Sequence, residues 1–257
     1  MIPDWLIVVS ILLFGACVGS FLNVCIYRLP RGESLVWPGS RCTSCGRALS
    51  WFENIPILSW AILGGRCRTC RAPVSAMYPI VEAITALAFL GGYLLYGLTP
   101  LALVRVAFAC MLIVLFVTDL QHKILPNAIT LPGIALGFAC SLFLPPGWRD
   151  SLIGIVVGGG VLLAIAEGYY RVRKEEGLGM GDVKLLAMIG AFLGWKLVLL
   201  TLVLASVSGS LIGVALIASQ RGDMKYALPF GTFLAIGAAV SAAWGTPIVD
   251  WYFGFYR

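Results

Sequence analysis

The chain has 257 residues, of which 60% are hydrophobic and only 12% are charged, and its mean hydropathy is +0.95. Soluble domains are usually about 45–50% apolar and about 25% charged. This composition excludes a soluble globule and a disordered chain, and it argues against a nucleic-acid binder despite the net charge of +6. The single histidine, His122, excludes an HExxH zinc site and is the only base that a Ser-His or Cys-His nucleophile could use. The sequence therefore predicts an all-α polytopic membrane protein.

Apolar segments near the length of a bilayer-crossing helix, about 20 residues, recur along the chain. The first, Trp5–Tyr27, lacks the basic start and the small-residue cleavage site of a signal peptide, so we expect a retained span. From Val183 to Ser219 the chain is apolar except at Gly194-Trp195-Lys196, which predicts two helices, the first of them short. About eight spans are expected in all, and the others are Tyr78–Tyr96, Leu101–Leu120, Ala128–Leu144, Leu152–Tyr170 and Tyr226–Trp244.

The basic residues orient these spans, because loops rich in Lys and Arg stay in the cytoplasm. With eight spans, 14 of the 18 Lys and Arg residues lie on one side, and both chain ends are expected outside. This orientation depends on the short span that begins at Val183, because a re-entrant segment there would move the later loop to the other side. The residues expected in the cytoplasm are Arg28, Arg31, Arg41, Arg47, Arg66, Arg68, Arg71, Lys123, Arg171, Arg173, Lys174, Lys184, Arg221 and Lys225. Those expected outside are Arg105, Arg149, Lys196 and Arg257.

Four cysteines lie in the expected cytoplasmic segment, as Cys42-Thr-Ser-Cys45 and Cys67-Arg-Thr-Cys70, with 21 residues between the pairs. Two C-x2-C pairs at such a distance are typical of a zinc ribbon, because four thiolates satisfy a tetrahedral Zn²⁺. Two disulfides or a redox centre are the alternative, but cytoplasmic thiols stay reduced. Four cysteines leave no open coordination position, so we expect one structural zinc ion. The expected parts of the chain are residues 1–27 (first span), 28–77 (zinc-binding loop) and 78–257 (a seven-helix membrane domain).

Two aspartates are expected at the cytoplasmic ends of spans, where an acidic group is costly and is a candidate for function. Asp119 ends the span Leu101–Leu120, and Asp182 follows Gly179-Met180-Gly181 at the start of the short span. Two carboxylates that share a site do not both ionise easily, so one can act as a base and the other as an acid. Such a pair can activate water against a peptide carbonyl and protonate the leaving amine. Gly179 and Gly181 would let a substrate backbone approach the acids closely.

Each of these residues also has a structural interpretation. Asp119 can pair with Lys123 or His122, Asp182 can cap its helix, and the glycines can form a flexible turn. If Asp182 lies at a helix N-terminus, the helix dipole favours it as the more readily ionised of the two acids. Two further acids within spans, Glu82 and Glu167, are explained by helix-packing hydrogen bonds as well as by function.

Taken together, these residues resemble the bacterial type IV prepilin peptidases, a family of aspartic proteases with a Gly-x-Gly-Asp motif. The likeness covers most of the chain, and the combination of motifs in this order is specific. The matching segments are Gly19–Pro30, the two cysteine pairs with Asn54–Trp60 between them, Tyr78–Glu82, Asp119–Asn127, Gly179–Asp182 and Leu228–Ala235.

The resemblance implies an enzyme of the bacterial inner membrane that removes the leader of prepilins and pseudopilins after a glycine, at the cytoplasmic face. It implies that the enzyme then methylates the new N-terminal amine with S-adenosylmethionine. By motif position, Asp119 and Asp182 would be the catalytic pair and Cys42, Cys45, Cys67 and Cys70 the zinc ligands. No nucleic-acid partner is expected. The alternatives are a peptidase without methyl transfer, and a transporter or assembly scaffold with a zinc-stapled loop whose acids carry protons or ions.

Overall fold

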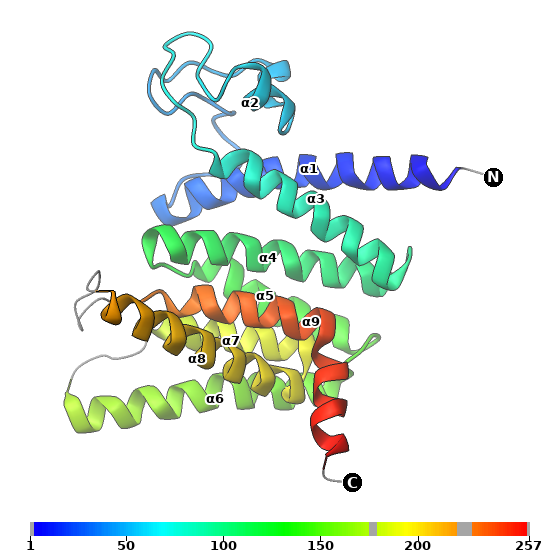
Figure 1. Cartoon of the computed structure of the whole chain (residues 1–257), viewed down its shortest axis with the longest axis vertical. Helices are drawn as coiled ribbons and strands as arrows, with labels where there is room; N and C mark the ends of the chain where they lie inside the picture. The colour runs from blue at the N-terminus through cyan, green and yellow to red at the C-terminus, as the bar shows by residue number, and fades with distance from the viewer. Residues whose placement is uncertain (1–2, 175–178, 220–227, 256–257) are drawn as a thin grey trace. The chain divides into compact units, whose positions relative to one another are not determined.

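The computed structural model describes residues 3–174, 179–219 and 228–255, and within these ranges it is helical and has no strand (Figure 1). Four positions used above, Arg221, Lys225, Tyr226 and Arg257, lie outside the described residues. The α-helices are α1 Asp4–Arg28, α2 Leu58–Ile62, α3 Met77–Tyr96, α4 Pro100–His122, α5 Asn127–Ser141, α6 Trp148–Arg173, α7 Met180–Leu193, α8 Trp195–Ala218 and α9 Phe230–Gly254.

Six of the described helices are long and apolar enough to cross a membrane: α1, α3, α4, α6, α8 and α9. This confirms the class of an all-α polytopic membrane protein. Helices α5 and α7 have only 15 and 14 residues. At 1.5 Å per residue, α7 is about 21 Å long, shorter than the hydrocarbon core of about 30 Å. The count of eight spans therefore stays a prediction.

Helix α7 is enclosed by other helices of its unit, which removes the need for it to match the thickness of a bilayer. Every residue from Leu185 to Leu193 is buried, and α5, α6, α8 and α9 all contact the helix (Figure 1). A helix that is apolar on all sides is stable in such a setting. It ends at Gly194, whose φ of +80° is a backbone conformation that glycine adopts without steric cost.

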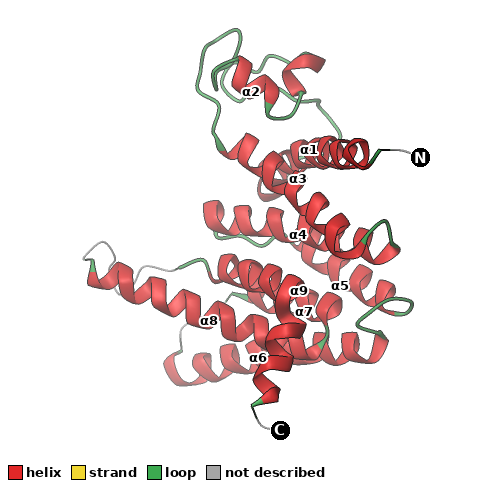
Figure 2. Ribbon diagram, turned by 45° about the vertical axis from the view of Figure 1, so that its right-hand side comes forward, coloured by secondary structure: helices red, strands yellow, loops and turns green. Residues whose placement is uncertain are grey.

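The chain forms two compact units, residues 1–114 and 115–257, and α4 contributes to both (Figure 2). The first unit contains α1, the loop that follows it, and α3. The second contains the end of α4 and helices α5 to α9, and therefore both aspartates. The expected division at residues 27 and 77 stays a prediction.

Small residues bring the helices of each unit close together. In the first unit, Gly15 and Gly19 of α1 lie against the backbone of Ala86 and Glu82 in α3, where a Cβ would come within 2.8 and 2.6 Å of the facing Cα atoms. In the second unit, Gly154 of α6 lies against the backbone of α7. Glycines spaced four apart are the usual device for close helix packing in membranes, where the lipid is as apolar as leucine. This packing holds α7, which carries Asp182, in a fixed place.

Candidate active site and metal centre

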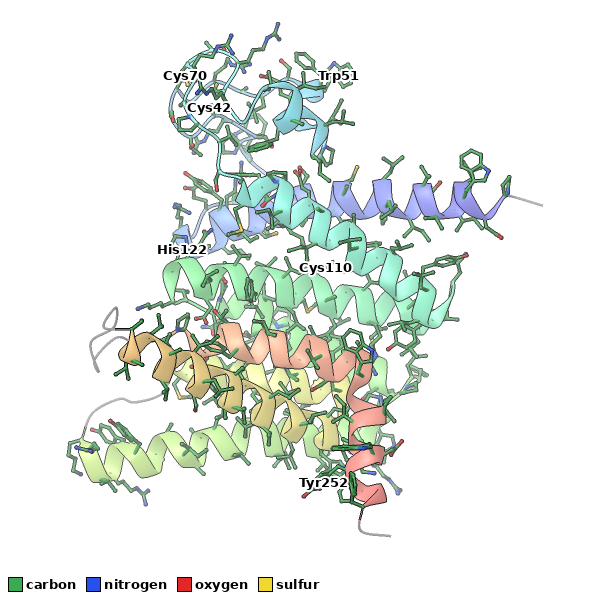
Figure 3. The ribbon with its side chains drawn as sticks, in the orientation of Figure 1. Cys42, Trp51, Cys70, Cys110, His122 and Tyr252 are labelled. Atoms are coloured by element: carbon green, nitrogen blue, oxygen red, sulfur yellow. The ribbon has the colours of Figure 1, made fainter. Side chains whose placement is uncertain are left out.

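Asp119 is only 5% exposed and lies three residues before His122, the last residue of α4, which is labelled in Figure 3. Asp119 Oδ2 accepts two hydrogen bonds from Thr232 in α9, one from the backbone N–H at 2.7 Å and one from the hydroxyl at 3.0 Å. Buried polar groups need such partners, because an unpaired one carries the full cost of desolvation. Asp119 is therefore held in one place by a residue 113 positions away in the chain.

Asp182 is the third residue of α7 and is half-buried. The N-cap of α7 is Gly179, so the interpretation of Asp182 as the helix cap is wrong. The backbone N–H of Asp182 donates to the carbonyl of Gly179 at 3.1 Å. Asp182 therefore lies in the first turn of the helix, where the dipole favours a negative charge.

The side chain of Leu125 lies between the segments that carry the two acids. A Cβ at Gly181 would come within 3.1 Å of the Leu125 side chain. A Cβ at Gly231 would come within 2.9 Å of Leu125 Cδ1 and 3.0 Å of Asp119 Oδ2. The end of α4 and the first turns of α7 and α9 therefore meet around Leu125. Asp119 and Asp182 lie near enough to act on each other electrostatically.

Gly231 and Thr232 lie in Leu228–Ala235, one of the segments that resemble the family, but neither has a chemical role that the sequence alone predicts. The signal that could have found them is their place at the start of the last apolar helix, the end that the charge pattern puts level with the two aspartates. A second contact supports the same region, because Lys184 Nζ donates to Asn127 Oδ1 at 2.9 Å and ties the start of α7 to that of α5.

The four cysteines of the loop form one cluster. Their sulfur atoms all lie within 4.8 Å of one another, and Cys42 Sγ lies 3.8 Å from Cys70 Sγ (Figure 3). Four thiols at this separation can hold a metal ion with tetrahedral geometry. All eight cysteines of the chain are free thiols.

The two C-x2-C pairs are built alike, so each presents its sulfur atoms from the same kind of turn. The Cys42 N–H donates to the carbonyl of Arg47, and the Cys67 N–H to that of Ala72, both at 2.9 Å. Each turn then reverses at a residue of positive φ, which is Gly46 at +73° and Arg71 at +58°. This local symmetry brings the two pairs to one point.

The thiol environment suits a cation. Backbone N–H groups of Cys70 and Thr69 lower the pKa of Cys67 to about 6, and those of Cys45 and Ser44 lower the pKa of Cys42. The pKa of Cys70 is about 11: although the N–H of Ala72 lowers it, the neighbouring Cys67 sulfur and burial raise it more. Four negative sulfur atoms repel one another, and a bound divalent ion removes that cost. The residues present therefore fit a metal ion.

Further contacts hold the loop around the cluster. Glu53 accepts two hydrogen bonds from the guanidinium of Arg47, at 2.6 and 3.0 Å, and one from the backbone N–H of Ser50 at 2.9 Å. The Arg47 guanidinium holds the pKa of Glu53 at about 2. The carboxylate of Glu82 in α3 accepts the N–H of Ile57 at 2.7 Å. Glu82 thus anchors the loop to a helix. On α6, Glu167 pairs with Arg171 at 2.7 Å. Glu82 and Glu167 therefore each have a structural partner.

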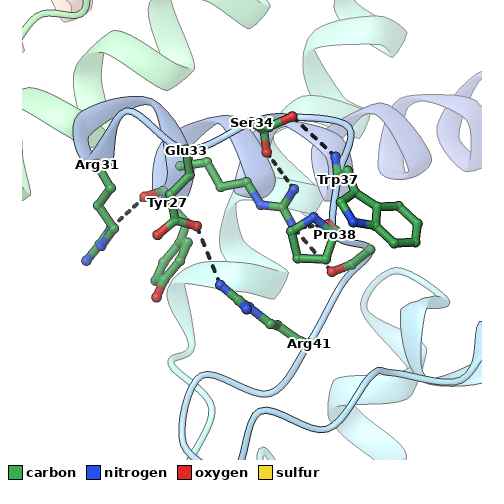
Figure 4. A network of polar contacts seen from close by, with 9 residues as sticks. Tyr27, Arg31, Glu33, Ser34, Trp37, Pro38 and Arg41 are labelled. Carbon is green, nitrogen blue, oxygen red and sulfur yellow. Dashed lines mark hydrogen bonds and ion pairs between the residues drawn. The ribbon is translucent and has the colours of Figure 1, made fainter.

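The start of the loop is anchored by Arg28 at the end of α1, and two residues that accept its hydrogen bonds, Ser34 and Pro38, are labelled in Figure 4. The Arg28 side chain is 6% exposed and donates to the carbonyls of Ser34 at 2.7 Å, Pro38 at 2.6 Å and Gly39 at 3.2 Å. Arg41 pairs with Glu33 at 3.8 Å nearby. Buried guanidinium groups order a segment because each of their fixed donors needs an acceptor. The loop therefore leaves α1 in a defined direction.

The fold and these two sites define a helical membrane protein with a pair of buried or half-buried acids and a four-cysteine metal-binding loop. Two family models match the chain. That of the bacterial peptidase A24 N-terminal domain matches residues 13–96, which include the loop, and that of the type IV leader peptidase family matches residues 106–214, which include both aspartates.

Curated proteins match the chain over most of its length. A prepilin leader peptidase/N-methyltransferase of Pseudomonas putida is 37% identical over 96% of this chain and 94% of its own. One of Pseudomonas aeruginosa is 34% identical with the same coverage. One of Myxococcus xanthus is 41% identical over 82% of this chain, and the match spans 64% of that relative's length. No solved structure matches. The chain belongs to the type IV leader peptidase family and is an enzyme of that family.

Proposed function

We propose that this protein removes the leader peptide of type IV prepilins and pseudopilins after a glycine and then methylates the new N-terminal amine. The observation that carries the proposal is the meeting of Asp119 and the Gly179–Asp182 turn around Leu125, in a chain whose full-length relatives are named prepilin leader peptidase/N-methyltransferase. The likeness to these relatives supports both activities and makes prepilins the substrate class.

The two acids suit peptide hydrolysis. One carboxylate removes a proton from water, whose oxygen attacks the scissile carbonyl, and the other gives its proton to the departing amide nitrogen. The dyad needs one proton between the two groups, which their mutual repulsion favours. Gly181 packs against Leu125, since a Cβ there would come within 3.1 Å of that side chain, whereas Gly179 is exposed beside Asp182. A substrate backbone can therefore lie against the turn.

S-Adenosylmethionine is the second substrate in this proposal and supplies the methyl group. The amine that receives the methyl exists only after cleavage, so the two reactions occur in a fixed order. Methyl transfer requires an unprotonated amine and does not require a pair of acids, so the two reactions need not share catalytic groups.

We assign the metal as one zinc ion held by Cys42, Cys45, Cys67 and Cys70. Thiolate ligands in two C-x2-C pairs favour zinc, and four protein ligands leave no position for water or substrate. The ion would therefore order residues 28–77 and take no part in the chemistry.

The proposed site faces the cytoplasm of a bacterium across its inner membrane, where the basic leader of a prepilin lies. The support is the excess of Lys and Arg on that side of the eight-span arrangement. Reporter fusions at Arg47 and Arg173 are expected to report the cytoplasm, and fusions at Arg149 the outer side. A fusion at Arg149 that reports the cytoplasm would contradict this orientation.

Mass spectrometry of a candidate prepilin, produced with and without this protein in the same cells, tests the function directly. We expect the pilin to lose its leader and to gain one methyl group only when the protein is present. Leader loss without the methyl group would leave a peptidase alone. An unchanged prepilin would favour a transporter or scaffold instead.

A further inference from the structure

We propose that Thr232 is a positioning residue that makes Asp119 the water-activating base of the pair and leaves the proton on Asp182. This inference rests on the proposed peptidase function and refines it. It reverses the expectation from the sequence, in which the helix dipole favours Asp182 as the ionised acid.

The geometry of the contact is specific to one oxygen. Both donors of Thr232, the backbone N–H and the hydroxyl, bind Asp119 Oδ2. Thr232 therefore does not bind the other carboxylate oxygen, Oδ1, and this oxygen can contact a water molecule. A carboxylate held by one oxygen cannot rotate freely, so Oδ1 keeps a single direction. Thr232 is itself 6% exposed, so water does not readily replace either hydrogen bond.

The local structure of α9 explains why these donors are available. Thr232 is the third residue of α9, and the first N–H groups of a helix have no acceptor within the helix. Pro229 at the N-cap supplies no side-chain hydrogen bond. Asp119 thus caps α9 from another helix. Gly231 permits the contact, because a Cβ there would come within 3.0 Å of Asp119 Oδ2.

The same contacts distribute the charge of the pair. Two hydrogen bonds to one oxygen and the positive end of α9 stabilise Asp119 as a carboxylate. Lys123, one turn further along the chain, adds a positive charge that acts on Asp119. The backbone N–H of Asp182 donates to the carbonyl of Gly179, and the Asp182 carboxyl group has the negative Asp119 as a neighbour. Lys184, on the same turn of α7 as Asp182, donates its hydrogen bond to Asn127 Oδ1. One proton shared by the two acids therefore resides on Asp182.

Two substitutions of Thr232 distinguish an effect on the position of Asp119 from a general effect on packing and stability. Thr232→Val keeps the shape and the backbone donor but removes the hydroxyl, whereas Thr232→Ser keeps both donors. Thr201→Val is the matched control, because Thr201 is fully buried in the same unit and its hydroxyl donates only to Leu197 of its own helix, at 2.8 Å. Cleavage of a prepilin in detergent is measured as kcat and KM across pH, with thermal unfolding recorded for every variant.

We expect Thr232→Val to lower kcat about tenfold to hundredfold, the usual effect of losing a hydrogen bond to a charged group, with KM unchanged. The acidic limb of its pH profile should move to higher pH, because Asp119 then takes up a proton more readily. Thr232→Ser and Thr201→Val should retain the wild-type profile.

A Thr232→Val protein with the wild-type kcat and pH profile would overturn the proposal. So would an equal loss in Thr201→Val, since the effect would then reflect packing alone. If Thr232→Val fails to fold, Thr232→Ala replaces it, and an unshifted pH profile in that variant contradicts the assignment. A wild-type protein that cleaves no prepilin would instead refute the proposed function, so the two failures are distinguishable.

Discussion

Asp119→Asn and Asp182→Asn are each expected to abolish leader cleavage while the protein stays folded. An amide can neither accept a proton from water nor donate one to the leaving nitrogen as an acid does, and acid–base catalysis typically contributes about 10² to 10⁴ in rate. The asparagine side chain is close in size to aspartate, and the Asp119 site can still accept the hydrogen bonds of Thr232 through its amide oxygen. The measurement is leader removal from a prepilin by purified protein of each variant.

Glu167→Gln is the matched control, because Glu167 is an exposed acid paired only with its neighbour Arg171 on α6. It should cleave at the wild-type rate. Near-normal leader removal by either aspartate variant would refute the catalytic pair.

The Asp119→Asn variant also shows whether methyl transfer depends on the two aspartates. Asp119→Asn should leave a full-length prepilin unmethylated, because the amine is never released, but should transfer labelled methyl to a pre-cleaved pilin. A folded variant that is inactive on the pre-cleaved pilin would mean that the aspartates serve both reactions. Wild-type protein inactive on that substrate would mean that the chain is a peptidase only.

Replacing any one of the four clustered cysteines by serine is expected to release the metal and disorder the loop. Elemental analysis of the wild-type protein should find about one zinc per chain, and each variant close to none. Structural zinc supplies about 10–16 kcal/mol in small zinc-binding peptides, far more than a loop of this size gains from its own contacts. Limited proteolysis should therefore cut the variants between Arg28 and Met77, where the wild type is protected.

Cys17→Ser is the control for this experiment, because Cys17 is an exposed residue of α1 outside the cluster. It should keep both the zinc and the resistance to proteolysis. Wild-type protein without zinc, or with a disulfide in the loop in cells, would show that the cluster is a redox centre or a set of free thiols.

Local features of the sequence predict much of this protein. Hydropathy and length identify the long helices, because a lipid-facing helix must carry its apolar character in its own residues. The spacing of Cys42, Cys45, Cys67 and Cys70 predicts the cluster, because each C-x2-C turn places its two sulfur atoms by short-range geometry. Gly194 marks the end of α7, because its positive φ is a local backbone requirement.

The contacts around the acids depend on the tertiary structure. No short-range pattern connects Asp119 to Thr232, or Ile57 to Glu82, since these partners are separated by 113 and 25 residues. Nor does composition show that α7 is enclosed by four helices, because a buried helix and a lipid-exposed one are equally apolar. The sequence alone thus determined the membrane class, the four-cysteine cluster and the candidate acids. Only the packing of α4 against α9 decided which residue holds the Asp119 carboxylate, because a buried hydrogen bond forms wherever folding brings a donor and an acceptor together, whatever their distance along the chain.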